Sequence, residues 1–155
     1  LRVHEILMGK TIPPLIVGIF HSTLFVLAAV FLFGVPLRGS LVLLYLSLIL
    51  YLVSIIGVGL FISSLAQTQQ QAFLGVVLFA APAILLSGFA TPIENMPHWA
   101  QVITWFNPVS YFVEVIRMVL LKGSGAVQIA KQFGIISLFA LVINGLAVLN
   151  YRKRA

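Results

Sequence analysis

Long uninterrupted apolar runs constrain the fold of this chain more than any other feature. A helix needs about 20 apolar residues to cross the ~30 Å hydrocarbon core of a bilayer. Four runs reach or approach that length, separated by polar or turn-forming stretches: 12–33, 41–62, 72–90 and 133–149. The pattern predicts an all-α integral membrane protein with four transmembrane helices.

Composition supports the same class. Hydrophobic residues make up 61% of the 155 residues and charged residues only 8%, whereas a soluble domain carries roughly a quarter charged residues. The net charge of +6 comes from basic residues near the ends of the apolar runs, which favours lipid headgroups over nucleic acid as their partner. Cysteine is absent, which excludes disulfides, a thiol nucleophile and cysteine-ligated metal.

Basic residues also indicate the orientation. Four spans place both ends of the segment on one side of the membrane. Arg2 and Lys10 precede the first span and the basic run 152–154 follows the last, so the positive-inside rule predicts that both ends are cytoplasmic. Four basic residues oppose this on the other side: Arg38, Arg117, Lys122 and Lys131.

Prolines and polar residues mark the expected boundaries. Pro13 and Pro14 are expected in the first turn of the first span, where a missing N–H costs little. The uncharged polar stretch 63–71 is expected to be a connecting loop, and Pro82 is expected to cause a kink or local unwinding in the third span.

The stretch 97–121 differs from the spans. Its first part carries apolar residues at helical spacing from Trp99 to Phe106, and Asn107-Pro108 stops that helix. The next piece, 109–121, makes a helix of only ~20 Å, too short to span. We expect a re-entrant helical hairpin that dips into the membrane from the non-cytoplasmic side. An interfacial helix pair lying flat is the alternative.

Polar residues within the spans have two readings. His21, Ser22 and Thr23 lie near the middle of the first span, where they either line a translocation path or form hydrogen bonds between helices. Five residues of the later spans are interpreted as positions of close helix packing: Ser47, Ser54, Gly57, Asn144 and Gly145. In the hairpin, Glu114 and Arg117 are three apart and are expected to form an ion pair, with direct substrate contact as the alternative.

Several motifs resemble one known family. "LLSGFATPIENMP" and "NPVSYFVEVIRMVLLKG", together with "FISSLAQTQQQA" and "EILMGK", closely resemble the permease domain of ABC-2 type transporters. The family's spacing of two prolines, an aromatic residue and an arginine is matched by Pro97, Pro108, Tyr111 and Arg117. The resemblance runs from about Glu5 to Tyr151. The residues expected to form a gate in the hairpin are Pro97, Asn107, Pro108, Tyr111, Glu114 and Arg117.

The resemblance implies a six-helix permease domain, of which this chain holds the last four spans. Such permeases are homo- or heterodimers in the bacterial inner membrane, and each half binds a cytosolic ATP-binding subunit that holds the ATP and magnesium. They export drugs, lipids or polysaccharides. Four residues before the first span are candidates for contact with that subunit or with lipid headgroups: Arg2, His4, Glu5 and Lys10. No cofactor is expected in this chain, because Gly9-Lys10-Thr11 lacks the upstream glycine of a phosphate-binding loop.

The residues also bear on two other classes of function. An ATP-independent channel or secondary transporter suits a discontinuous helix, but charged residues at the midplane are missing. An intramembrane enzyme is disfavoured because the chain has no Asp, and Ser87-Gly88 lacks the glycine of a protease turn at position 85. A metal site is disfavoured as well, since Glu94 and His98 have no third ligand.

Overall fold

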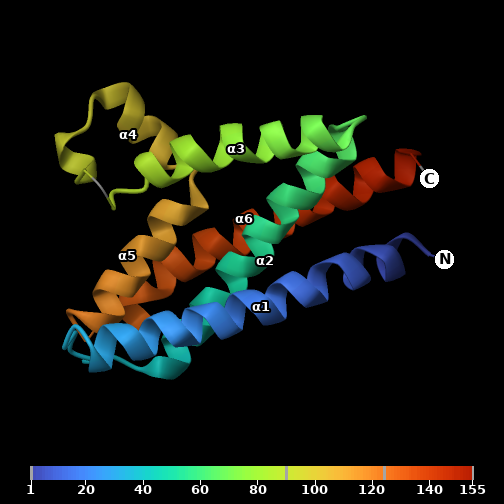
Figure 1. The fold of residues 1–155 in the computed structure, drawn as a ribbon. Coiled ribbons are helices and arrows are strands. Elements are labelled where there is room, and N and C mark those ends of the chain that lie inside the picture. Colours follow the sequence, from blue (N-terminus) through green and yellow to red (C-terminus); the bar gives the residue numbers. More distant parts are fainter. Residues whose placement is uncertain (1, 90, 124, 155) are drawn as a thin grey trace.

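The computed structural model describes residues 2–89, 91–123 and 125–154, which are predominantly α-helical. The elements in chain order are α1 (Val3–Phe31), α2 (Leu41–Leu65), α3 (Gln69–Leu85), the 3-10 turn η1 (Ile93–Asn95), α4 (His98–Thr104), α5 (Pro108–Leu120) and α6 (Ala126–Arg154). Both chain ends lie at one end of the molecule, and α4 lies toward the opposite end, beside the end of α3 (Figure 1). The predicted all-α class is confirmed.

Within the part of the chain that the structure describes, three helices are long and apolar enough to cross a bilayer, by length and composition: α1 and α6 with 29 residues each and α2 with 25. Each is longer than the ~30 Å hydrocarbon core requires. α3 has 17 residues and reaches ~26 Å. It corresponds to the predicted third span, whose last residue, Ala90, lies outside the described residues.

α1 begins earlier than the sequence reading expected. The Glu5 carboxylate accepts a hydrogen bond from the Arg2 backbone N–H (3.0 Å), so the helix starts with a capping interaction ahead of Val3. Pro13 and Pro14 therefore lie inside α1, and their predicted place in its first turn was wrong. Prolines are tolerated inside membrane helices because local adjustments and neighbouring groups satisfy the freed carbonyls.

The connection between α2 and α3 is shorter than the predicted loop 63–71. α2 continues to Leu65 and α3 starts at Gln69, because the Thr68 hydroxyl caps α3 by accepting from the Gln71 N–H (3.2 Å). Glutamine is a good helix former once such a cap is present. At Pro82 the helix is not interrupted: α3 continues through this residue and ends three residues later, at Leu85.

α2 and α6 run in the same direction and pack closely. Near the middle of both helices, the Asn144 amide donates to the carbonyl of Val53 (3.2 Å). A Cβ at Gly57 would stand only 2.7 Å from Asn144 Nδ2, so the two backbones approach at this glycine. The packing roles predicted for Ser54, Gly57 and Asn144 are confirmed, as is the burial of Ser47. Gly145 is exposed, so its predicted packing role was wrong.

α5 packs where α2 and α6 meet, and this junction is the core of the described structure. The core side chains are Leu44 of α2, Val115, Val119 and Leu120 of α5, and Ile129 and Ile136 of α6. Because α5 is amphipathic, its apolar face is buried in this core while Glu114 and Arg117 remain exposed. The packing fixes α5 between long helices and brings its two ends close to other segments.

Candidate functional site

The predicted hairpin 97–121 is present as two short helices. α4 has seven residues and follows Pro97, while α5 has 13 residues and begins at Pro108. Three residues separate them, and proline at the first position of α5 lacks only an N–H that would have no helical partner. The break in the helix at Asn107-Pro108 is thus confirmed.

Asn107 joins the start of α5 to the end of α3. Its Oδ1 accepts from the Val109 backbone N–H (3.1 Å), and its Nδ2 donates to the Ala83 carbonyl (2.7 Å). The Ala83 carbonyl belongs to the last turn of α3, where carbonyls have no helical partner. Asn107 is 6% exposed, so one buried side chain satisfies polar groups at two helix ends.

Two further side chains connect α5 back to α4. The Tyr111 hydroxyl donates to the Trp105 carbonyl (2.8 Å), and the buried Ser110 hydroxyl donates to the Thr104 carbonyl (3.1 Å). Both carbonyls lie at the C-terminal end of α4, and that of Thr104 also accepts from the Asn107 backbone N–H (3.1 Å). These hydrogen bonds set the angle between the two helices of the hairpin.

Arg117 contacts the turn that follows α3. Its guanidinium donates to the Gly88 carbonyl (2.9 Å) rather than to Glu114, which is exposed, so the predicted ion pair was wrong. The three-residue spacing allows a pair, but an exposed pair gains little, and the guanidinium reaches a carbonyl instead. Gly88 has φ +85°, a conformation that favours glycine. This turn therefore depends on Gly88 to present its carbonyl to Arg117.

Arg38, in the loop between α1 and α2, contacts the C-terminal end of α5. Its backbone N–H donates to the Leu120 carbonyl (3.3 Å), and its guanidinium donates to the Leu121 carbonyl (3.4 Å). A cation is also favourable at a helix C-terminus. A Cβ on Gly39 would collide with the Val119 carbonyl, which explains the glycine. The sequence did not predict this contact, because Arg38 and the end of α5 are far apart in the chain and come together only in the fold.

A cavity of about 300 Å³ lies between α1, α2 and α5. Its lining residues are Ser22, Phe25, Val26 and Ala29 of α1, Leu44, Tyr45 and Leu48 of α2, and Phe112, Ile116 and Leu120 of α5. Only Ser22 and Tyr45 bring side-chain polar groups to it. The cavity thus borders the hairpin helix and two long helices at once.

The three polar residues predicted for a translocation path are placed differently. Ser22 lines the cavity. Thr23 lies next to it, and its hydroxyl oxygen is 2.8 Å from the Tyr45 hydroxyl. His21 is exposed, with Nδ1 2.9 Å from the Val17 carbonyl of its own helix. The structure therefore associates Ser22, and Thr23 through Tyr45, with the cavity but not His21.

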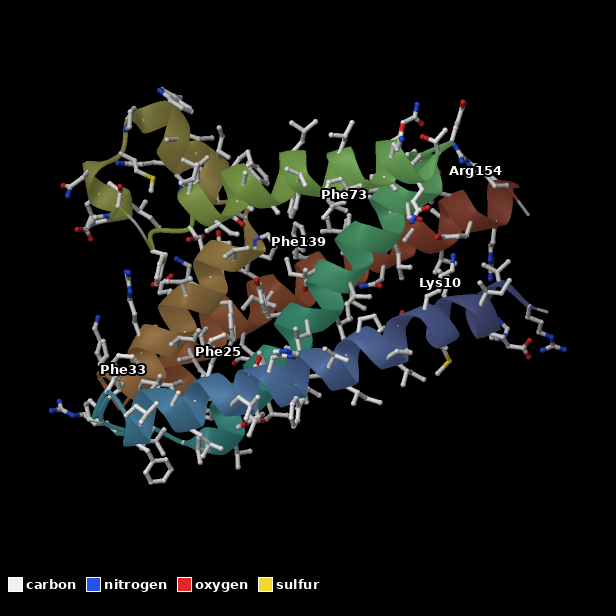
Figure 2. The ribbon with its side chains drawn as sticks, in the orientation of Figure 1. Lys10, Phe25, Phe33, Phe73, Phe139 and Arg154 are labelled. Carbon is white, nitrogen blue, oxygen red and sulfur yellow. The ribbon has the colours of Figure 1, made fainter. Side chains whose placement is uncertain are left out.

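The residues predicted to meet an ATPase subunit lie at the end of the molecule that holds both termini. Arg2, His4, Glu5 and Lys10 are all exposed. The Lys10 ammonium approaches the Tyr151 hydroxyl (3.4 Å) and lies 5.0 Å from the centre of that ring. Lys10 and Arg154 occupy this same end (Figure 2). Contact with a partner subunit stays a prediction.

In residues 2–89, 91–123 and 125–154, no three His, Cys, Asp or Glu side chains gather in a group that could hold a metal ion. Glu94 and His98 are both exposed on the segment around α4. The polar contacts of the site are hydrogen bonds between side chains and helix-end carbonyls, an arrangement that positions helices.

Apolar membrane-length helices that enclose a short helical hairpin define a polytopic membrane domain. Residues 1–121 match the family model of the ABC-2 type transporter, and the chain belongs to this family. Among similar proteins of Escherichia coli K12 are the "Probable multidrug ABC transporter permease YbhR", 45% identical over 80% of this chain, and the "Probable multidrug ABC transporter permease YbhS", 36% identical over 97% of it. "Inner membrane transport permease YhhJ" from the same strain is 31% identical over 96% of the chain.

The matched segments cover 34% of the length of the first of these relatives and 40% of the other two. The chain therefore spans well under half of each of these proteins. No solved structure shows a significant match to the chain.

Proposed function

We propose that this chain is part of the permease of an ATP-driven ABC exporter, which moves drug-like, lipid or other amphipathic cargo out across a bacterial inner membrane. Membership of the ABC-2 type transporter family and the similarity to permeases named as multidrug transporters support this. ATP is hydrolysed by a partner ATP-binding subunit, and two permeases form a homo- or heterodimer.

One observation carries the mechanism: α5 is held at both ends by different segments. Asn107 at its start donates to the last turn of α3, and Arg117 in its last turn donates to the turn that follows α3. The C-terminal end of α5 is also tied to the loop between α1 and α2 through Arg38. A displacement of α3 relative to α2 therefore acts on α5 directly. We assign the hairpin the role of a re-entrant gate on the non-cytoplasmic side. In this assignment α3 also crosses the membrane, so that α1, α2, α3 and α6 make up the four spans.

The basic end of the molecule supports the proposed orientation, with both termini cytoplasmic. Lys10 and Arg154 lie at the same end as both termini (Figure 2), and the adjoining Arg152 and Lys153 are exposed. Basic residues favour the cytoplasmic side. This orientation places the exposed start of α1 where an ATP-binding subunit binds, and the hairpin near the opposite face.

Inside-out vesicles containing the intact transporter test the proposal. ATP should drive accumulation of ethidium, and a non-hydrolysable ATP analogue should not. Asn107→Ala should lower the initial rate at least several-fold, because the hairpin loses its connection to α3, whereas Asn95→Ala, an exposed position in η1, should not. Uptake that follows an ion gradient without ATP would instead identify a secondary transporter.

Cysteine labelling tests the position of the hairpin, because the 155 residues contain no cysteine. Single cysteines at exposed positions of 97–121 should react with a membrane-impermeant maleimide added outside intact cells. Reaction only after the cytoplasmic face is opened would refute the re-entrant gate while leaving the transport function intact.

A further inference from the structure

We propose that the cavity between α1, α2 and α5 is a binding site for a neutral, ring-containing amphiphile with one hydroxyl or carbonyl group, which enters from the bilayer. The proposal concerns ligand binding by this segment, so it stands or falls independently of ATP-driven transport. The cavity has a volume of about 300 Å³, which is at the lower end of the range for small-molecule sites.

The hydroxyl of Ser22 is available to such a ligand. Other hydroxyls on α1 donate to a carbonyl one turn earlier: Thr11 to Leu7 (2.7 Å) and Thr23 to Ile19 (2.8 Å). Ser22 lines the cavity and forms no such bond among the described residues. A hydroxyl at membrane depth without a partner in its own helix favours a polar group of the occupant.

Tyr45 supplies the second polar group. Because the single proton of Thr23 goes to the Ile19 carbonyl, the Tyr45 hydroxyl donates to Thr23 Oγ1, 2.8 Å away. The Tyr45 oxygen then retains a lone pair that can accept from a ligand. With one hydroxyl that donates or accepts, one further acceptor and no charged lining residue, the cavity selects a neutral molecule.

Aromatic side chains define the rest of the ligand's chemistry. Phe112 forms part of the wall and is stacked on Tyr51 with ring centres 4.3 Å apart, so its position is fixed. Phe25 also lines the cavity and is 74% exposed. Offset and edge-to-face contacts with these rings favour an aromatic or fused-ring body.

The exposed surface of α1 indicates where the ligand enters. Large apolar side chains such as Leu24 and Phe31 are exposed on α1, as expected of a surface that faces lipid. A neutral amphiphile concentrates in the bilayer and reaches the cavity past Phe25. Once bound, it contacts Phe112 and Ile116, and therefore α5 of the hairpin.

Binding of radiolabelled 1-naphthol to the intact protein in lipid nanodiscs tests the site, with empty nanodiscs as the background. Ala29→Leu fills the cavity and should abolish saturable binding. Ala28→Leu is the matched control, because Ala28 is its neighbour on α1 but is not among the lining residues. Ser22→Ala should weaken binding roughly fivefold, the worth of one hydrogen bond, while Thr11→Ala should leave it unchanged. Naphthalene, which lacks the hydroxyl, should compete only weakly with 1-naphthol for the unsubstituted protein. Its own affinity should be the same for Ser22→Ala, because it makes no hydrogen bond to Ser22.

Equal binding by the Ala28 and Ala29 variants would overturn the proposal. A second measurement, the reactivity of a thiol placed in the cavity, distinguishes an open cavity from one that is covered by another protein segment. In Ser22→Cys, N-ethylmaleimide should modify the thiol, and 1-naphthol should slow the reaction. A thiol that stays unreactive in the intact protein, but reacts after denaturation, would show that another protein segment fills the cavity and would equally refute the ligand site.

Discussion

The α2–α6 pair and the α3–α5 region are held together by different physical means. α2 and α6 meet along small and buried residues, with Gly57 pressed against Asn144. α5 meets α3 through individual side chains that donate to carbonyls at a helix end. Close packing of backbones leaves little freedom, whereas a few hydrogen bonds can be exchanged for others at small cost. The molecule thus combines a rigid pair of helices with an attachment suited to rearrangement.

The largest effect is expected at the rigid pair. A Cβ at Gly57 would stand within 2.9 Å of both Asn144 and Ile143, so Gly57→Leu should force α2 and α6 apart and lower the free energy of unfolding by about 3 kcal/mol. Gly59→Leu is the matched control, since nothing lies within 4 Å of its Cβ position. Thermal unfolding in mild detergent measures both. Equal melting temperatures would show that the approach at Gly57 is not close in solution.

The next largest effect concerns the attachment itself. Asn107→Ala removes the cap of α5 and leaves the Ala83 carbonyl without its donor, which should cost about 2 kcal/mol. Asn107→Asp keeps the acceptor for the Val109 N–H but sets a buried carboxylate against the Ala83 carbonyl, so it should cost at least as much as Asn107→Ala. Hydrogen exchange should quicken in the first turn of α5 and not in the centre of α6. A uniform increase in both would mean that Asn107 supports the whole fold rather than this attachment.

Gly88 offers a smaller perturbation of the same region. Its φ of +85° is strained for any other residue, and a Cβ would stand 3.1 Å from Ile93. Gly88→Ala should therefore destabilise by about 1–2 kcal/mol. Gly134→Ala is the control, because it is exposed within α6 and should stabilise by up to about 1 kcal/mol. Unfolding in detergent compares the two, and an unchanged Gly88→Ala variant would mean that the turn adopts another conformation.

The sequence predicted the helices of this chain better than the contacts between them. Apolar run length located α1, α2 and α6, and Asn107-Pro108 located the break in the hairpin, because both signals are local. The start of α1 was misplaced because Pro13 and Pro14 were assigned to its first turn, whereas α1 begins at Val3 with a cap that includes Glu5.

Site residues show the same division. Arg117 was singled out as a charge in a costly position, but its partner, the Gly88 carbonyl, comes from a distant segment. The carbonyls of Ala83 and Gly88 carry no signal in a sequence, since every residue has one. Arg38 looked like a headgroup contact until the fold placed the end of α5 beside it.

The smallest predicted effect separates Arg117 from its neighbour in sequence. Arg117→Ala loses the hydrogen bond to the Gly88 carbonyl and should cost about 1 kcal/mol, whereas Glu114→Ala should change stability by less than about 0.5 kcal/mol. The double variant should be additive within about 0.3 kcal/mol, and exchanging the two residues should not restore what Arg117→Ala loses. Equilibrium unfolding in detergent gives all four values. A coupling energy near 1 kcal/mol would mean that the two charges pair after all, and that α5 is attached to α3 by Asn107 alone.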